Sequence, residues 1–514
     1  MPLGFVHLIV ALISFIPFSI YLIHKRRFHS SSRHPPSPRK LPLIGNLHQL
    51  GTYPHRSLQS LSNRYGELML LHFGHVPVLV VSSANAAREI MKNQDLLFSN
   101  RPKLRIPDKL LYESMDIAFA PYGEYWRQVR SISVLHLLNN RRVQSFRRVR
   151  EEETSKMVEK IMELGSSSSS GVVNLSDVLV SLTNDVVCRA ALGRKYGDGG
   201  EREKFKILLN EFVELLGSSS FGDYVPCLSW IDRVSGLDAR VEKVAKQFDQ
   251  FLEGVVEEHR MRGRKIDIMS CDNEDEGVDF VDILLEFQRQ NAATSPIEDD
   301  VIKVIVLDVF AAGTHTTYAS LEWAMSELLR HPKIMERLQN EMREVVGRKE
   351  EITEDDLEKM HYLKAVIKEN LRLHVPIPLL VPRESTQDSE VFGYDVAANT
   401  RVIINAWAIA RDPSVWKNPE EFRPERFLND QTTTNIDFKG LHFELIPFGA
   451  GRRGCPGVTF AMSINELALA KLVHKFHFVL PNGAKPEDLD VSEANGLTIS
   501  KKFPLLVVAT PRTH

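Results

Sequence analysis

The chain has 514 residues, of which 43% are hydrophobic and 25% are charged, as is usual for a folded globular protein. A largely disordered chain is excluded, because there is ample apolar surface to bury. The formal net charge of −3 gives no general positive field for phosphates, so nucleic acid is not an expected partner.

The first element in chain order is an uncharged apolar run at residues 3–23. At roughly 1.5 Å per residue, a helix of this length spans about 30 Å of hydrocarbon. Lys25, Arg26 and Arg27 follow it, and positive charges tend to stay on the cytosolic side. The alternative, a cleaved signal peptide, has its basic residues before the apolar run. We therefore expect a single-pass membrane anchor at residues 1–24, with the rest of the chain facing the cytosol.

A basic, proline-rich segment follows at residues 25–50. Its run His34-Pro35-Pro36-Ser37-Pro38 favours a stiff, extended spacer over helix or sheet, because the proline ring fixes φ. We expect this segment to be a hinge between the anchor and a catalytic domain at residues 51–514. Length alone leaves the number of structural domains open, since some large enzymes have one continuous core.

Helical patterns dominate the body up to about residue 375, and short β-like runs such as residues 400–404 follow. The expected fold class is therefore mainly α with a small β subdomain. The serine run at residues 166–170 and the acidic patch at residues 272–276 carry no apolar anchors. We expect both to be solvated connections.

One long helix is strongly marked near the middle of the chain. Ser295 can cap it, with Pro296 in its first turn and Glu298 completing a capping box. The helical pattern ends at Arg330. Its apolar residues lie on more than one side, which predicts a helix that runs through the core.

The centre of this helix reads Ala312-Gly313-Thr314-His315-Thr316-Thr317. A glycine inside a helix costs about 1 kcal/mol relative to alanine, so another interaction must compensate. One explanation is close packing against a second helix, with threonine hydroxyls bonded to the preceding turn. The other is a functional role for this stretch.

The chain has four cysteines, Cys188, Cys227, Cys271 and Cys455, and no Cys-x-x-Cys pair. A zinc site, a redox pair and a disulfide framework are therefore not expected. Any important cysteine should act singly, as a thiol or a thiolate.

Cys455 lies in the run Phe448-Gly449-Ala450-Gly451-Arg452-Arg453-Gly454-Cys455-Pro456-Gly457, just before a helical pattern at residues 460–472. Its glycines let the backbone approach a planar ligand, the helix start favours a thiolate, and the arginines can meet ligand carboxylates. Such a sulfur suits a soft or borderline metal ion.

Two alternatives stand beside a metal-binding Cys455. It can be a buried, inert cysteine. Gly449, Gly451 and Gly454 also fit the dinucleotide pattern G-x-G-x-x-G, but that loop needs a leading strand within a β-α-β unit, and here Pro447 precedes it. Nicotinamide binding at this loop is therefore disfavoured.

Four separated motifs resemble those of the cytochrome P450 superfamily, in the right order. The cysteine loop fits F-x-x-G-x-R-x-C-x-G, residues 369–372 fit E-x-x-R, residues 424–427 read Pro-Glu-Arg-Phe, and residues 126–130 fit W-x-x-x-R. The runs at residues 121–127 and 443–449 resemble the plant A-type branch, which includes family 71. The resemblance covers almost the whole chain.

This resemblance implies a cytochrome P450 fold, preceded by the single membrane helix, with haem b (iron protoporphyrin IX) as cofactor. It implies that Cys455 is the axial ligand of the haem iron. The further residues implied to bind the cofactor are Phe448, Trp126, Arg130, Arg383 and Arg453, and those implied to form a structural charge triad are Glu369, Arg372 and Arg426.

One departure from the family pattern lies in the long helix. The family has A/G-G-x-D/E-T, whereas this chain has His315 in place of the acid and keeps the alcohol at Thr316. The resemblance makes both residues catalytic, with Thr316 helping to deliver protons to bound dioxygen. Histidine titrates near neutral pH, so His315 can relay protons itself or can point toward solvent.

The function that the resemblance implies is monooxygenation at the endoplasmic reticulum membrane. O2 and electrons from NADPH-cytochrome P450 reductase, with cytochrome b5 as an optional second donor, would oxidise a small apolar plant specialised metabolite. Terpenoid, phenylpropanoid or coumarin, and alkaloid substrates stay open. The implied substrate-contact regions are residues 101–119, 310–317, 377–381 and 495–498.

Two other function classes also stay open. An oxygen-independent haem-thiolate lyase, isomerase or dehydratase, for example acting on an aldoxime, is compatible with the altered acid position. A non-enzymatic haem carrier is the third class, and it would need no large pocket.

Overall fold

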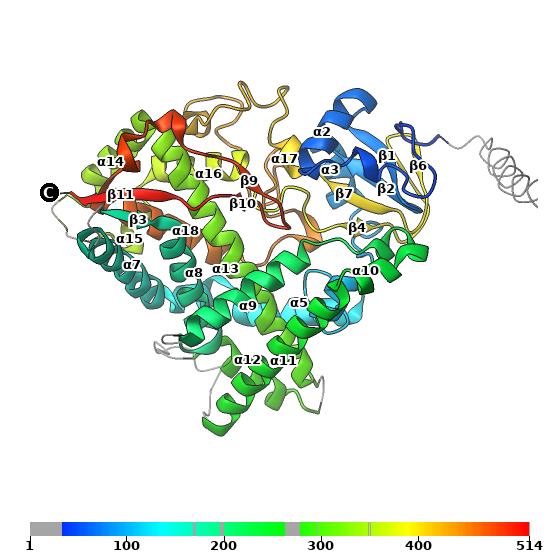
Figure 1. Ribbon diagram of the computed structural model, residues 1–514, viewed down its shortest axis with the longest axis horizontal. Coiled ribbons are helices and arrows are strands. Elements are labelled where there is room, and N and C mark those ends of the chain that lie inside the picture. Colours follow the sequence, from blue (N-terminus) through cyan, green and yellow to red (C-terminus); the bar gives the residue numbers. More distant parts are fainter. Residues whose placement is uncertain are drawn as a thin grey trace, which may run out of the picture.

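The computed structural model of the protein describes residues 33–167, 171–195, 200–262, 278–293, 296–347, 349 and 351–512. They form a large helical body with a small four-stranded sheet to one side (Figure 1). The fold class that the sequence predicts is confirmed. The anchor at residues 1–24, the basic cluster Lys25 to Arg27 and Ser295 lie outside the described residues.

The axis of the helical body is α13, Asp299–Arg330, which is buried along most of its length. It packs against α8, Leu175–Leu192, and α18, Val458–Lys475 (Figure 1). Among the described residues, α13 alone is long and apolar enough to cross a membrane. Because 61% of its apolar window is buried inside the protein, it is a core helix, as its sequence predicts.

The predicted start of this helix is wrong. Pro296 precedes the helix, and Glu298 occupies the N-cap position without a side-chain cap bond. Asp299 and Asp300 instead lie in the first turn, where carboxylates favour the positive end of the helix dipole. The predicted end at Arg330 is correct, and Pro332 opens the next helix.

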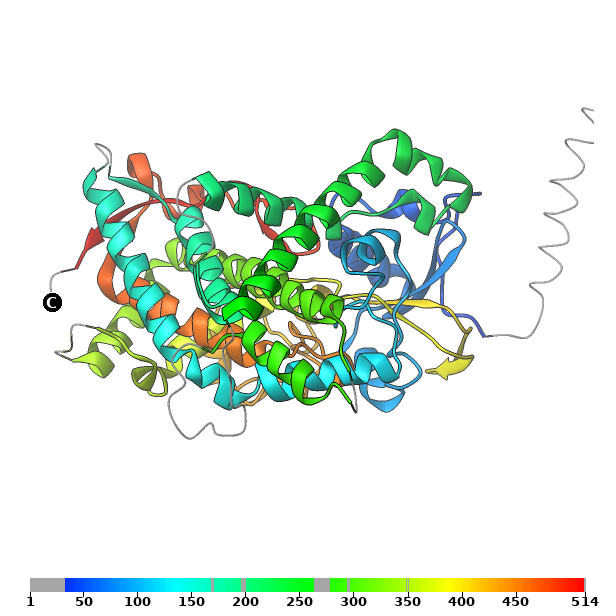
Figure 2. The same cartoon turned by 90° about the horizontal axis from the view of Figure 1, so that it is seen from below.

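Helices α9 and α11 pack against α13 (Figure 2), whereas α2 and α3 lie beside the four-stranded sheet (Figure 1). The bounds of the remaining helices are α2 Pro54–Tyr65, α3 Ala84–Arg88, α4 Arg105–Leu110, α5 Glu124–Ile132, α6 Asn140–Ser145, α7 Arg147–Ser167, α9 Gly200–Leu216, α10 Trp230–Val234, α11 Leu237–Arg262, α12 Phe280–Gln290, α14 Pro332–Val346, α15 Glu354–Leu357, α16 His361–Leu373 and α17 Ala406–Ile409.

The largest sheet joins distant parts of the chain. The strands β1, Leu68–Phe73, and β2, Val76–Val81, form an antiparallel hairpin. Strand β7, Arg401–Ile404, runs parallel to β2, and β4, Arg383–Glu384, pairs with β7. The predicted strand near residues 400–404 is confirmed. This pairing carries Arg383 to the region where the cysteine loop lies.

The sequence prediction missed β1 and β2, which precede residue 375. Their apolar residues do not alternate cleanly, since side chains on both faces are covered, and such runs have no period that distinguishes strand from helix. The smaller strands are β3 Val172–Asn174, β5 Ser389–Val391, β6 Tyr394–Val396, β8 Phe476–Val479, β9 Glu493–Ala494, β10 Ser500–Lys501 and β11 Leu506–Pro511.

The structure describes residues 33–50 of the proline-rich segment. Residues 33–40 contain neither helix nor strand, whereas Leu41 and Gly45 form an isolated bridge and Leu47–Gln49 form a 3-10 helix. The segment is held to the sheet region, because the amide of Leu70 donates to the carbonyl of Pro36 at 3.0 Å. The amide of Asp395 likewise donates to the carbonyl of Arg33 at 2.8 Å. Its assignment as a hinge stays a prediction.

Candidate active site

The cysteine loop is a closed turn at the start of α18. The amide of Cys455 donates to the carbonyl of Phe448 at 2.9 Å. Gly451 has a φ of +68°, and a Cβ there would lie 2.2 Å from the carbonyl oxygen of Met91, so no other residue fits. The predicted helix after the loop is confirmed, since α18 begins at Val458.

The side chain of Cys455 is exposed, although protein surrounds its loop. A cavity of about 410 Å³ adjoins it and is lined also by Met91, Phe443 and Phe448. Although the Cys455 side chain is open to this cavity, the protein around it removes most of its water, and this desolvation raises the pKa of the thiol more than the Gly457 amide and Arg130 lower it. The helix start therefore does not by itself ionise the sulfur. A bound metal cation would supply the missing positive charge, because it holds a thiol deprotonated.

Four arginines gather beside this loop. Arg101, Arg383 and Arg453 are buried, and Arg130 is half-buried. Arg453 belongs to the loop, and two others bond to it: Arg130 donates to the Gly454 carbonyl at 2.6 Å, and Arg383 donates to the Ala450 carbonyl at 3.1 Å.

Among the described residues, the one ion pair made by these four arginines joins Arg383 to Asp95 at 3.7 Å. Burial, followed by repulsion from Arg383, lowers the pKa of Arg453 to about 9. Burial lowers the pKa of Arg383 to about 10, and lowers those of Arg101 and Arg130 as well. Such a cluster of buried cations fits a ligand that carries carboxylates.

Trp126, on α5, belongs to the same group. Its ring lies 4.1 Å from the guanidinium of Arg453, and its Nε1 donates to the carbonyl of Ile117 at 3.0 Å. Arg453 also donates to the carbonyls of Ser99 at 2.8 Å and Ala120 at 2.7 Å. Three separate parts of the sequence are therefore brought together around the Cys455 loop: Trp126 and Arg130 on α5, Arg383 on β4, and Arg453 in the loop itself.

Arg101 was missed as a member of this cluster, because the sequence analysis placed it at the edge of a substrate-contact region. It donates to the carbonyls of Ala118 at 2.7 Å and Val381 at 2.6 Å. Its only sequence signal is a lone basic residue between Asn100 and Pro102, and no spacing links it to the cysteine loop.

The middle of α13 contains the glycine and threonines that the sequence singled out. Ala312 is exposed, although its neighbour Ala311 is buried, and the Thr316 hydroxyl donates to the Ala312 carbonyl at 2.7 Å. A Cβ on Gly313 would lie 3.3 Å from Val187 of α8. Close helix packing therefore explains the glycine. The threonine bond to the preceding turn is also present.

His315 does not point freely into solvent. Burial lowers its pKa to about 4, so the imidazole is neutral at physiological pH. Its Nε2 lies 3.4 Å from the Tyr318 hydroxyl, and the two rings meet edge to face. Its Nδ1 has no hydrogen-bond partner among the described residues.

The predicted charge triad forms as a fully buried unit. Arg372 donates to Glu369 through Nε at 2.8 Å and through a terminal nitrogen at 2.9 Å. Arg426 donates to Glu369 at 3.0 Å. All three side chains are buried, so Glu369 and Arg372 are not an ordinary ion pair on a helix surface.

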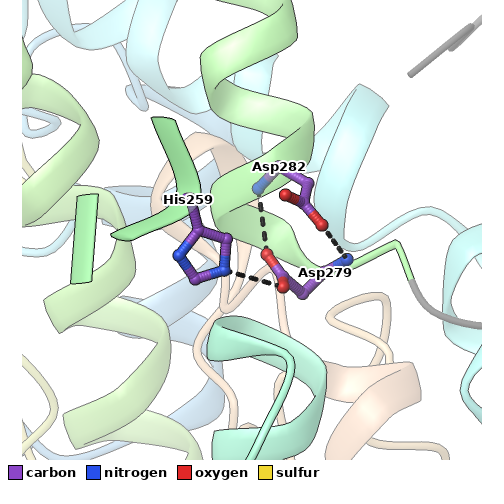
Figure 3. A group of neighbouring side chains, drawn as sticks. All are labelled: His259, Asp279 and Asp282. Atoms are coloured by element: carbon purple, nitrogen blue, oxygen red, sulfur yellow. Dashed lines mark hydrogen bonds and ion pairs between the residues drawn. The ribbon is translucent and has the colours of Figure 1, made fainter. Parts of the chain in front are cut away.

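A further buried cluster, His259 with Asp279 and Asp282, has the side chains of a metal site (Figure 3). Its geometry is that of a helix cap, since Asp279 and Asp282 form the capping box of α12. His259 bonds the Val255 carbonyl at 2.7 Å and the Asp279 carboxylate at 2.9 Å. Both partners are acceptors, so the ring carries two protons and has no lone pair for a metal.

Comparison with known proteins agrees with this arrangement. The family model described as Cytochrome P450 matches residues 35–507. The chain is 61% identical to Cytochrome P450 71A6 of Nepeta racemosa, over 98% of this chain and 99% of that protein. It is 55% identical to (+)-menthofuran synthase of Mentha piperita, over 98% and 99% of the two chains.

A third relative, norfluorocurarine oxidase of a Strychnos species, is 54% identical over 97% of each chain. The solved structure titled "Zebra fish cytochrome P450 another structure with Abiraterone" superposes with a TM-score of 0.73 at 27% identity. That match covers 90% of this chain and all of the other. The chain therefore belongs to the cytochrome P450 family, whose cofactor is haem.

Proposed function

We propose that this chain is a membrane-anchored monooxygenase that inserts one oxygen atom of O2 into a small apolar plant metabolite. The observation that carries the proposal is the convergence of an accessible Cys455 sulfur with a cluster of buried arginines. A thiolate and several cations together match a metal porphyrin with two carboxylates, and little else.

Different residues would hold the haem iron and the haem propionates. Cys455 ligates the iron, and the iron charge offsets the burial that otherwise keeps this thiol protonated. Arg130, Arg383 and Arg453, with Trp126, would hold the propionates, while Phe448 lies in the cysteine loop. Haem supplies the activation of dioxygen. Glu369, Arg372 and Arg426 act on structure only, because they hold the chain between residues 410 and 426.

The overall reaction consumes substrate C–H, O2, two electrons and two protons, and yields C–OH and water. The Thr316 hydroxyl lies on the open side of α13 and can turn from the Ala312 carbonyl to donate a proton. His315 is neutral, so it serves as a two-sided carrier, accepting at one ring nitrogen while it donates from the other. We assign proton delivery to this pair.

The substrate is a small apolar specialised metabolite of the terpenoid, phenylpropanoid or alkaloid kind. Support comes from the half-buried apolar side chains of Ile377, Leu379, Leu380 and Val381, next to the buried arginine cluster. Support also comes from two relatives, one named for making menthofuran and one for oxidising norfluorocurarine.

The cellular setting is a proposal as well. Residues 1–24 anchor the chain in the endoplasmic reticulum membrane, residues 25–50 form the hinge, and residues 51–514 form the catalytic domain on the cytosolic side. NADPH-cytochrome P450 reductase supplies the electrons, with cytochrome b5 as an optional donor. This assignment rests on the uncharged apolar run and the basic cluster that follows it.

The test is spectroscopic and then enzymatic. The reduced, carbon monoxide-bound protein should show the red-shifted band of thiolate-ligated haem, and Cys455→Ser should lose it. With reductase and NADPH, product from plant metabolite extracts should require O2. Turnover without O2 or reductase would instead support a lyase, isomerase or dehydratase. A protein that folds but does not bind haem would contradict the proposal.

A further inference from the structure

Asp95 lies against the cysteine loop, although no sequence motif connects the two. It follows the short π-helix η2, Glu89–Asn93, and π-helical turns are rare and often occur at functional sites. A Cβ built on Gly451 would lie 3.3 Å from Oδ1 of Asp95. Asp95 also lines the cavity of about 410 Å³ beside Cys455. Its carboxylate therefore belongs to the immediate surroundings of the proposed iron ligand.

The Asp95 carboxylate lies between two arginines. Oδ2 is 3.0 Å from Nε of Arg452, whose side chain is half exposed, and Oδ1 is 3.7 Å from a terminal nitrogen of Arg383, which is buried. Among the described residues, Oδ1 accepts no hydrogen bond, so its effect on Arg383 is electrostatic. The Asp95 side chain is itself only 14% exposed. Asp95 therefore links a cation at the surface to a cation of the buried cluster.

The charge of Asp95 opposes the positive field of the arginine cluster. The cluster holds four guanidinium groups, and Asp95 is the one acid that forms an ion pair with any of them in the part of the chain that the structure describes. Burial lowers the pKa of Arg383 to about 10, and the charge of Asp95 is the main effect that opposes this change. Charges interact strongly where protein excludes water. Asp95 therefore offsets part of the positive charge beside the cysteine loop.

We propose that Asp95 is a positioning residue that acts through Arg383 and lowers the reduction potential of the haem iron. The inference rests on the proposed function and assigns a role to a residue outside every motif that the sequence analysis identified. The iron gains one electron when it is reduced from the ferric to the ferrous state, so cations nearby favour the reduced form and an anion nearby disfavours it. Arg383 would divide its charge between Asp95 and a haem propionate.

A purely structural role for Asp95 is the alternative. The ion pair with Arg452 can fasten the segment after η2 to the cysteine loop, and its removal would then loosen that loop without a specific effect of charge. The two roles differ in sign. A charge effect reverses when the positive partner is removed instead of the negative one, whereas a loosened loop responds in the same direction to both changes.

The experiment is a potentiometric titration of the haem-loaded full-length protein without substrate or reductase, followed by haem absorption. Asp95→Asn keeps the shape of the side chain and removes its charge. The ferrous form should then be favoured about threefold, which is a rise of ~30 mV in the midpoint potential. Asp95→Glu keeps the charge and should stay near the wild type.

Asp238→Asn is the matched control. The Asp238 carboxylate also lies between two arginines, 3.4 Å from Arg105 and 3.9 Å from Arg233, and its side chain is 24% exposed. Asp238 does not line the cavity beside Cys455, so the removal of its charge should leave the midpoint potential unchanged.

Arg452→Gln supplies the opposite charge change at a half-exposed position, so it tests the inference even if Asp95→Asn does not bind haem. It should lower the midpoint potential. An unchanged potential in Asp95→Asn or in Arg452→Gln, or shifts of the same sign in the two variants, would overturn the inference. The reduced carbon monoxide band separates the two proposals. Its absence from the wild type defeats the haem assignment, whereas its presence with unchanged potentials defeats only the role of Asp95.

Discussion

The Nε of Arg426 donates to Oε1 of Glu369 at 3.0 Å, and the same carboxylate oxygen also accepts from Arg372 at 2.9 Å. None of the three side chains is more than 1% exposed. One buried carboxylate therefore compensates two guanidinium groups. The arginines complete their hydrogen bonds at carbonyls such as those of Ala410 and Lys417.

We expect Glu369→Gln to lower the free energy of unfolding by about 3–5 kcal/mol, because it leaves two buried cations without a counter-charge. Urea unfolding followed by circular dichroism measures this. Glu163→Gln is the control, since Glu163 pairs with Lys160 on the surface and should change stability by less than about 1 kcal/mol. Equal effects in the two variants would contradict the role of the triad.

Gly451→Ala tests the close approach of the cysteine loop to Met91. The added Cβ would meet backbone at 2.2 Å in a residue with a φ of +68°, so the loop must shift. We expect lower haem content and a weakened carbon monoxide band in the purified protein. Gly254→Ala, inside α11 with nothing within 4 Å of the new Cβ, should be neutral or stabilising by up to about 1 kcal/mol.

The residues that the sequence identified share one property, which is a short, fixed spacing. Glu369 and Arg372 lie on one helical turn, and Phe448, Arg453 and Cys455 lie in one loop, so a local pattern is enough to find them. Local spacing also predicted the core position of α13, because its apolar residues surround the helix.

The residues that the sequence missed are brought together only by the tertiary fold. Arg101 reaches the cluster through carbonyls of Ala118 and Val381, which are distant in the chain. Asp308 accepts the amide of Ile117, which lies 191 positions earlier in the chain. Periodicity in the sequence predicts helices and strands, but it does not predict contacts between residues so far apart. The thiol of Cys455 shows the same limit, since its helix start favours ionisation and only the fold reveals the larger effect of burial.

His259 provides a prediction about pH. Burial alone would lower the pKa of His259, but the hydrogen bond to Asp279 raises this pKa above its usual 6.5. The stability contributed by a histidine whose pKa is raised on folding is fully present below pH 6.5. It is lost as the pH rises through the pKa of that histidine in the folded state. His259→Gln should therefore cost about 1–3 kcal/mol at pH 6, and the difference from wild type should shrink toward pH 9.

Chemical unfolding of both proteins across this pH range measures that difference. His361→Gln, at an exposed position, is the control and should show no such trend. Adding a chelator should leave the His259 result unchanged, because both ring nitrogens of His259 are engaged by acceptors in the cap of α12. A stability loss on chelation would contradict this interpretation.

His315→Asp restores the acid that other family members carry at this position. Burial lowers the pKa of His315 to about 4, so the imidazole is neutral at pH 7 and is a weak acid donor. The stability that depends on this neutral form is present above pH 6.5 and is lost as the pH falls through about 4. We expect the carboxyl in His315→Asp to raise, by about twofold, the fraction of NADPH electrons recovered in product.

The measurement is product formed per NADPH consumed, with hydrogen peroxide as the wasted fraction. Thr316→Ala should lower this ratio, because it removes the hydroxyl on the open side of α13. Tyr318→Phe removes the hydroxyl that lies 3.4 Å from the imidazole and keeps the ring contact, so it separates proton transfer from packing. If His315→Asp and Tyr318→Phe both match the wild type while Thr316→Ala does not, His315 is a packing residue and the threonine delivers protons without it.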